Sequence, residues 1–468
     1  MKVRTFFTTI AILVCTSSVS EAQQPIALHP DNPHYFQYKG KPLLLVTSAE
    51  HYGALLNLDF DYNRYFDELA SERMNLTRTF TGVYCEPPGA FNIGNNTLAP
   101  LPNRLITPWA RSSEPGYKNG GNKFDLTQWD PAYFERLKSF MQEADKRDIM
   151  VEFTLFCPFY EDTMWVFSPL HPLNNVNSTP DIPRTDVYTT DKSGKLFEIQ
   201  KALVRKLVTE LNGFNNIIFE ICNEPYFGGV TMEWQHAIAD VIIDAEKSLP
   251  KKHLISQNIA NATKLIENPH PNISVFNFHY AYPPVAVAQN YHLNKPIGDN
   301  ETGFNGSSDS IYRFEGWRFM LAGGALYNNL DYSFTPGHEA GDYKYNDKTP
   351  GGGSDALRKQ LGYLRKFMER FNFLKMSPDS LLIDPEQSKN IRYNAISEKG
   401  NQYAVYLLDL HSSSLTLNIP DGRYEVQWMH PLTGKYEKAR TEKSTNNRLT
   451  LEVPAYKEDL ALRIVKKN

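Results

Sequence analysis

The segment Phe219-Glu220-Ile221-Cys222-Asn223-Glu224-Pro225 is an apolar run that ends in an asparagine, a carboxylate and a chain-turning proline. A second segment of the same kind is Pro296-Ile297-Gly298-Asp299-Asn300-Glu301-Thr302-Gly303. In a barrel of parallel strands, the functional side chains follow the carboxyl ends of the strands. We therefore interpret Glu224 and Glu301 as strand-end residues at one mouth of such a barrel.

The surrounding sequence supports a barrel. From about residue 34 to 373, short apolar runs alternate with amphipathic helical stretches, a rhythm typical of strand–helix units and a parallel sheet. One helix is marked by Asp130-Pro131, a capping residue followed by a proline at the first helical position. Eight strands are predicted, the number that closes a (β/α)8 TIM barrel, at 43–47, 76–81, 150–156, 217–222, 254–257, 275–280, 296–300 and 325–330.

The pattern changes near residue 374. The rest of the chain alternates apolar and polar residues with a period of two, and Asp421-Gly422 and Thr433-Gly434 are turn signals. We predict an α/β fold in which a barrel domain at 25–374 is followed by a small all-β sandwich domain at 375–468. The strands expected in the sandwich are 403–408, 415–417, 424–428, 449–451 and 460–465.

The first residues have the pattern of a signal peptide. Lys2 and Arg4 precede a short apolar stretch, and Ser20-Glu21-Ala22 supplies small residues for cleavage. We predict removal of residues 1–22 and a secreted or periplasmic location; lipid modification of Cys15 is the less favoured alternative. No later run approaches the roughly 20 apolar residues of a membrane span.

Composition limits the remaining function classes. The formal charge of −4 gives no basic footprint for nucleic acid. Cys85, Cys157 and Cys222 lie in or just after apolar runs, so we expect buried thiols and no disulfide framework. No short His, Cys or Glu spacing typical of zinc occurs, and Gly351-Gly352-Gly353 lacks the strand and lysine of a phosphate loop. We expect neither a metal nor a cofactor, and the oligomeric state is left open.

Strands four and seven lie on opposite sides of an eight-stranded ring, so Glu224 and Glu301 can converge across its mouth. Two facing carboxylates are the equipment for hydrolysing a glycosidic bond. The hypothesis is that Glu224 is the general acid/base and Glu301 the nucleophile, with carboxyl groups about 5–5.5 Å apart as retention of configuration requires. The alternative is a pair of ordinary surface or capping carboxylates.

Asn223-Glu224 after strand four and Glu301 after strand seven resemble the clan A glycoside hydrolases, which are (β/α)8 barrels that include the cellulase-like family five. The resemblance covers about residues 34–373 and implies a retaining glycosidase that acts on a carbohydrate. It also implies that Arg78 holds the nucleophile carboxylate and that Asn223 binds the 2-hydroxyl of the sugar. A guanidinium would keep Glu301 ionised; the alternative for Arg78 is a structural ion pair with Glu220.

His279 and Tyr280 resemble the strand-six histidine and tyrosine beside the catalytic pair of that clan. Their spacing departs from the cellulase-like pattern, so Tyr280 and Tyr282 both remain candidates for the donor to Glu301. Two further departures are the absence of a strand-three histidine at 154–158 and of a strand-eight tryptophan at 329–334. These departures argue against β-1,4-glucanase activity.

Other polar groups are predicted at the same mouth. Glu50 and His51 follow strand one as candidate sugar ligands, and Glu86 and His338 lie in loops on that side. Long loops at 84–128 and 159–191 indicate a pocket and an exo-acting enzyme. The tail resembles a collagen-binding-type C-terminal domain, here interpreted as a stabilising appendage. The rival hypotheses are a catalytically inactive carbohydrate-binding barrel and an adhesion protein that acts through its C-terminal domain.

Overall fold

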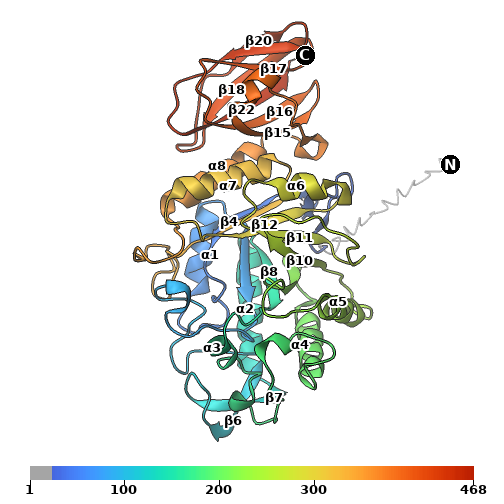
Figure 1. The fold of residues 1–468 in the computed structure, drawn as a ribbon, viewed down its shortest axis with the longest axis vertical. Helices are drawn as coiled ribbons and strands as arrows, with labels where there is room; N and C mark the ends of the chain where they lie inside the picture. The colour runs from blue at the N-terminus through green and yellow to red at the C-terminus, as the bar shows by residue number, and fades with distance from the viewer. Residues whose placement is uncertain (1–23, 468) are drawn as a thin grey trace, which may run out of the picture.

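The computed structural model describes residues 24–467, so the predicted signal peptide lies outside the described residues. The predicted barrel is confirmed: eight parallel strands pair in the order β4-β13-β12-β11-β10-β9-β8-β5. The two end strands contact each other, and the Phe80 amide donates to the Tyr52 carbonyl between them at 3.0 Å, so the sheet closes into a barrel (Figure 1). The strands are β4 (Leu45–Ala49), β5 (Leu76–Phe80), β8 (Met150–Phe156), β9 (Ile217–Cys222), β10 (Leu254–Asn261), β11 (Val275–His279), β12 (Ile297–Thr302) and β13 (Leu326–Leu330).

Helices follow most of these strands and surround the sheet. The predicted start of α2 is confirmed, since the Asp130 side chain accepts a hydrogen bond from the Ala132 amide and Pro131 is the first helical residue. The apolar face of α2 is buried against the barrel, as its helical spacing predicts. The helices of this part are α1 (Tyr62–Ser71), α2 (Pro131–Lys146), α4 (Leu196–Leu211), α5 (Met232–Glu246), α6 (Val285–Asn290), α7 (Asp309–Leu321) and α8 (Asp355–Met368).

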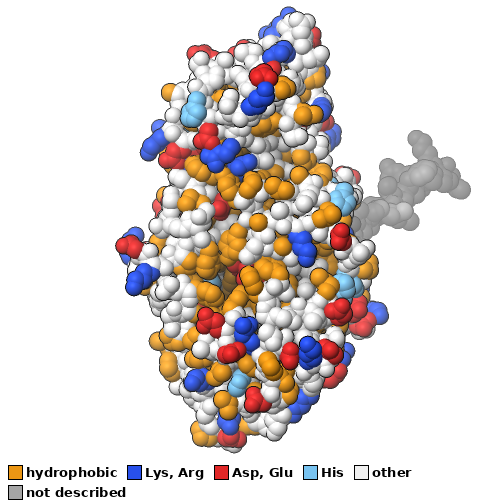
Figure 2. All heavy atoms as spheres, viewed as in Figure 1, with side chains coloured by type: hydrophobic (Ala, Val, Ile, Leu, Met, Phe, Trp, Pro, Cys, Tyr) orange, Lys and Arg blue, Asp and Glu red, His pale blue; other side chains and the backbone are white. Residues whose placement is uncertain are grey.

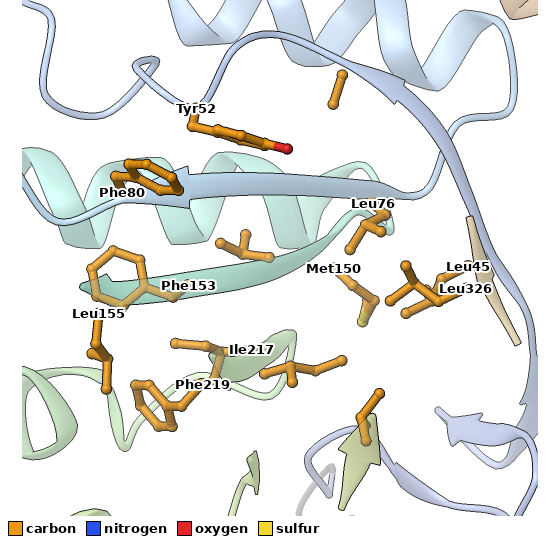
Figure 3. Packing of buried hydrophobic residues seen from close by; sticks show 14 of the residues in the cluster. Leu45, Tyr52, Leu76, Phe80, Met150, Phe153, Leu155, Ile217, Phe219 and Leu326 are labelled. Atoms are coloured by element: carbon orange, nitrogen blue, oxygen red, sulfur yellow. The ribbon is translucent and has the colours of Figure 1, made fainter. Parts of the chain in front are cut away.

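The two ends of the barrel interior differ. At the amino-terminal ends of the strands, Leu45, Leu76, Met150 and Leu326 pack together (Figure 3). Toward the carboxyl ends, the buried interior side chains are polar or charged, and they include Arg78, Glu152, Glu220, Asn277 and Asn300. The apolar end stabilises the barrel, while the polar end lies directly beneath the predicted site.

The loop predicted at 84–128 is wrong in part, because an antiparallel hairpin of β6 (Trp109–Pro115) and β7 (Asn122–Trp129) occupies its second half. Its register shifts interrupt the period-two pattern that would have revealed it. The remaining short elements of the barrel part are β1 (Ala27–Leu28), β2 (Phe36–Tyr38), β3 (Lys41–Leu43), η1 (Ala90–Asn92), α3 (Asp162–Trp165), η2 (Pro172–Asn174), η3 (Arg184–Asp186), η4 (Tyr291–Leu293) and η5 (Phe373–Lys375).

The C-terminal part is the predicted β-sandwich with its own apolar core. One sheet has the order β14-β15-β16-β22-β18-β19 with β20 beside β18, and the other pairs β17 with β21. The bounds are β14 (Ser377–Pro378), α9 (Pro385–Ser388), β15 (Arg392–Glu398), β16 (Gln402–Leu408), β17 (Ser414–Asn418), β18 (Gly422–His430), β19 (Lys435–Tyr436), β20 (Arg440–Ser444), β21 (Arg448–Glu452) and β22 (Asp459–Lys466).

The sandwich sits against α7 and α8 at the end of the barrel part (Figure 1). Buried Trp317 of α7 stacks on Tyr406 of β16 with ring centroids 5.3 Å apart. Buried Arg313 of α7 donates to Asp459 at 2.9 Å and to Glu458 at 2.5 Å. Within residues 24–467, no helix combines the length and the hydrophobicity that crossing a membrane requires.

Candidate active site

Glu224 and Glu301 converge, as their strand-end positions predicted. Glu224 lies just after β9 with a φ of 35°, and the turn is closed by the Phe227 amide, which donates to the Glu224 carbonyl at 3.0 Å. Glu301 lies near the end of β12. One carboxylate oxygen of each residue, together with a ring nitrogen of His279, falls within 4.8 Å of the others.

Four donors surround the carboxylate of Glu301. Tyr52 donates to Oε2 at 2.7 Å, and Tyr280 donates to Oε1 at 2.5 Å. Arg78 Nη1 lies 3.3 Å from Oε2, and His279 Nδ1 lies 3.3 Å from Oε1. Burial alone would raise the pKa of Glu301, but the charges of His279 and Arg78 and the hydrogen bonds of this group hold that pKa below its usual range. Glu301 is therefore an anion over the ordinary pH range.

Arg78 makes both of the contacts that the sequence left open, with Glu220 and with Glu301. Its Nε and Nη2 donate to Glu220 at 2.8 and 2.5 Å, while Nη1 reaches Glu301. Nη2 also donates to Asn223 Oδ1 at 2.6 Å. Burial would lower the pKa of Arg78, but the charges of Glu220 and of its other neighbours raise it well above the usual value. The buried ion pair thus orients the guanidinium that faces Glu301.

Glu224 has a different environment. Tyr160 donates to its Oε2 at 2.7 Å, and Tyr226 donates to its Oε1 at 3.1 Å. Asn223 supports this arrangement, since its Nδ2 donates to the Tyr160 oxygen at 2.8 Å. The only cationic side chain recorded against Glu224 in the described chain is His279, at 3.1 Å. Both carboxylates therefore receive two tyrosine hydroxyls and contact His279, and they differ in that the guanidinium of Arg78 lies 3.3 Å from Glu301.

His279 joins the two carboxylates. Its Nδ1 lies 3.1 Å from Glu224 Oε1 and 3.3 Å from Glu301 Oε1. Burial lowers the pKa of the imidazole, but the charge of Glu301 and the hydrogen bonds to both carboxylates raise it to about 9. The two carboxylates therefore favour the protonated form of the ring.

His51 and Glu86 form a second polar group on the pocket wall. His51 Nε2 lies 3.5 Å from Glu86 Oε1, and burial of the ring is outweighed by the Glu86 charge, which raises the pKa of His51. Tyr84 donates to Glu86 Oε1 at 3.0 Å, and Asn96 donates to Oε2 at 2.5 Å. A buried, fixed carboxylate and imidazole of this kind can orient hydroxyl groups of a ligand.

Two residues predicted to bind sugar lie elsewhere. Glu50 is fully buried. Its carboxylate accepts hydrogen bonds from the amides of Gly53 and Ala54 at 2.9 and 3.0 Å and so closes the turn after β4. Tyr282 contacts the C-terminal domain, with its hydroxyl 3.2 Å from Arg392. Of the two tyrosines left open by the sequence, the structure places Tyr280 against Glu301.

One pocket of about 280 Å³ contains this site, near the lower end of the range of about 300–1,000 Å³ for small-molecule sites. Of the residues described above, its lining includes His51, Tyr52, Tyr84, Glu86, Tyr160, Asn223, Glu224, Tyr280 and Glu301. Tyr52, Tyr84 and Tyr160 were missed by sequence reasoning. Tyr52 has a φ of 61° and stacks on Phe80 at 4.8 Å (Figure 3), while Tyr160 follows the end of β8. A position just after a barrel strand is the one signal that could have drawn attention to them.

Glu224, His279 and Glu301 are also the one group of possible metal ligands found among the described residues. A cation there would face the guanidinium of Arg78 at 3.3 Å from Glu301 and the charge of His279. The donors already bound to Glu301 oppose such use, because a metal would have to displace them. The three thiols are buried and free, as predicted for Cys85, Cys157 and Cys222.

Comparison with solved structures confirms the expected fold. A candidate glycoside hydrolase from Bacteroides vulgatus matches with a TM-score of 0.69 and 14% identity, over 95% of this chain and 83% of that one. A family 5 glycoside hydrolase from the same species matches with a TM-score of 0.63 and 14% identity, over 94% of each chain. A family 5 mannosidase from Rhizomucor miehei matches with a TM-score of 0.50 and 13% identity, over 74% of this chain and 98% of that one.

Sequence comparisons identify no relative of this chain. No protein-family model matches the chain, and no curated protein sequence matches it. The chain therefore shares its barrel and sandwich with family 5 glycoside hydrolases at low identity, and this similarity shows the fold. What the site does has to be argued from its geometry.

Proposed function

We propose that this protein is a retaining glycoside hydrolase in which Glu301 is the nucleophile and Glu224 the general acid/base. The observation that carries the proposal is the difference between the two carboxylates. Glu301 is held as an anion by Arg78, by His279 and by two tyrosine hydroxyls. Glu224, which faces it, also receives two tyrosine hydroxyls and lies 3.1 Å from His279, but it has no guanidinium partner among the described residues.

The reaction follows from these roles. A Glu301 oxygen attacks the anomeric carbon while Glu224 gives its proton to the glycosidic oxygen, so that bond breaks and the alcohol leaves. Glu224, now a carboxylate, then takes a proton from water, and the resulting hydroxide attacks the anomeric carbon and releases Glu301. The approach of the two carboxyl groups to within 4.8 Å supports retention, since inverting enzymes need about 6.5–9.5 Å.

The structural neighbours support the same class of reaction. Two of them are described as family 5 glycoside hydrolases, one of these as a mannosidase. We propose a carbohydrate substrate for this chain on that basis and on the site geometry. Because the sugar is chosen by a few hydrogen bonds in the pocket, the glycone is to be identified by screening. From the predicted signal peptide we also propose that the protein acts outside the cytoplasm.

The experiment is a screen of phenyl glycosides of different sugars with the wild type and two variants. Glu224→Gln and Glu301→Gln should each lower kcat/KM by roughly 10³-fold or more, since each removes a group that acts in the transition state. Glu233→Gln, an exposed change in α5, is the matched control and should retain activity. Unchanged hydrolysis in both site variants would reject the assignment, and binding of sugar without hydrolysis by the wild type would indicate a binding barrel.

A further inference from the structure

The mouth of the pocket is built differently from its floor. At the floor lie the buried polar side chains of Glu86, Asn223, Glu224 and Glu301. At the mouth, Phe91, Phe227 and Phe304 line the same pocket and are 37%, 44% and 39% exposed. Among the described residues these are the phenylalanines with large exposure, and all of them gather at this one site. Singly exposed apolar residues need no explanation, but three around one pocket do.

The three rings form one continuous rim. Phe91 lies edge-on to Tyr160 at 5.6 Å and to Phe304 at 6.2 Å, and Phe227 lies 6.0 Å from Tyr160. Phe304 is also 6.0 Å from Tyr280. Hydrophobic side chains gather over the barrel on the face that Figure 2 shows, whereas charged side chains are common at both ends of the molecule. The rim therefore offers an apolar, aromatic surface to a ligand that enters the pocket.

Two of the three rings, Phe91 and Phe227, lie beside the proposed acid/base. Tyr160, which donates to Glu224, is flanked by Phe91 and Phe227, and the Phe227 amide donates to the Glu224 carbonyl. The group that receives the proton of the acid/base is the leaving alcohol, so the leaving alcohol must lie on this side.

We propose that the leaving group recognised by this enzyme is an apolar aromatic alcohol, and that the natural substrate class is glycosides of phenolic or similar flat ring compounds. The sugar would occupy the polar floor, and the ring of the aglycone would pack against Phe91, Phe227 and Phe304. This inference rests on the proposed function. A flat aromatic ring is apolar on its faces and its edge, so it suits three phenyl side chains better than a second sugar ring, whose edge hydroxyls need polar partners.

The test compares phenyl and 2-naphthyl glycosides of the sugar found by the screen, because the two leaving groups are chemically alike and differ in apolar area. The wild type should prefer the naphthyl glycoside by roughly tenfold in kcat/KM. Phe227→Ala, and in separate variants Phe91→Ala and Phe304→Ala, should lower this preference several-fold. Leu173→Ala, an exposed apolar change outside the pocket, should leave the preference as it is.

Two results would overturn the inference and leave the proposed function intact. The first is equal kcat/KM for the phenyl and naphthyl glycosides. The second is better cleavage of a disaccharide of the same sugar than of either aryl glycoside, together with unchanged kcat/KM in the phenylalanine variants. Failure to cleave any glycoside would count against the proposed function instead. In that case, calorimetric binding of free 2-naphthol still decides the inference. Binding that weakens about tenfold in Phe227→Ala supports the aromatic site, and absence of binding to the wild type rejects it.

Discussion

At the scale of single residues, the two carboxylates share His279 and each have a pair of tyrosine donors, and Arg78 distinguishes them. Glu301 receives hydrogen bonds from Tyr52 and Tyr280 and faces Arg78, while Glu224 receives hydrogen bonds from Tyr160 and Tyr226. The strand-end positions of the two glutamates could be predicted from sequence, because an apolar run followed by a turn residue marks the end of a strand. The tyrosines other than Tyr280 could not, because their contacts depend on how loops distant in sequence fold together.

Tyr280→Phe tests the support of the nucleophile. Loss of the 2.5 Å hydrogen bond removes one of the interactions that lower the pKa of Glu301, so that pKa rises. The nucleophile must be ionised, and the acidic limb of kcat/KM against pH should move to higher pH, with kcat lowered by about 10- to 100-fold. Tyr282→Phe, two residues further on and outside the site, is the matched control. An identical pH profile for both variants would contradict this role of Tyr280.

The charge of His279 predicts a pH dependence of stability. The pKa of its imidazole is raised from 6.5 to about 9, so its protonated form is favoured by folding. Its contribution to stability is complete below pH 6.5 and is lost as the pH rises through about 9. Denaturant unfolding should show that the wild type loses more stability between these values than His279→Gln does. The same loss in both proteins would mean that His279 does not carry this charge.

At the scale of elements, Arg78 connects three strands, since it extends from β5 to Glu220 on β9 and to Glu301 on β12. Arg78→Lys keeps the charge but loses the planar fork that satisfies several acceptors. We expect a loss of about 3 kcal/mol in the free energy of unfolding, because one ammonium cannot reach Glu220 and Glu301 together and leaves a buried carboxylate without its partner, and we expect a lower kcat. Arg104→Lys is the control, since its ion pair with Asp59 is partly exposed and should contribute under about 1 kcal/mol. Equal stability of the two variants would contradict the connecting role.

Elements also show why some sequence predictions failed. The eight barrel strands were predictable because each is a short apolar run between helices with clear periodicity. Glu50 has the residue type and position of a ligand, yet the neighbouring amides of Gly53 and Ala54 bind its carboxylate. The β6–β7 hairpin was missed because its strands carry charged residues and irregular register, which hide the alternation. Neither the hydrogen bonds of Glu50 nor the irregular register of the hairpin leaves a pattern in a single sequence.

At the scale of the whole molecule, the sandwich is tied to the barrel by a buried contact. Asp459 of β22 accepts hydrogen bonds from Arg313 of α7 at 2.9 Å and from Tyr406 at 2.7 Å. Asp459→Ala leaves Arg313 buried without this partner and should lower the free energy of unfolding by about 3–5 kcal/mol. Below the melting temperature KM should be unchanged, because the contact lies outside the pocket. If Asp459→Ala melts at the same temperature as the wild type, the two domains are not coupled through this pair.

In the proposed reaction, Glu301 attacks the sugar and Glu224 serves both steps. A proton NMR time course of the hydrolysis of a phenyl glycoside measures the configuration of the first product directly, before its anomers equilibrate. Two successive displacements at the anomeric carbon predict that the first product has the same anomeric configuration as the substrate. A first product with the opposite configuration would contradict the account, because water would then have attacked the sugar directly and Glu301 could not be the nucleophile.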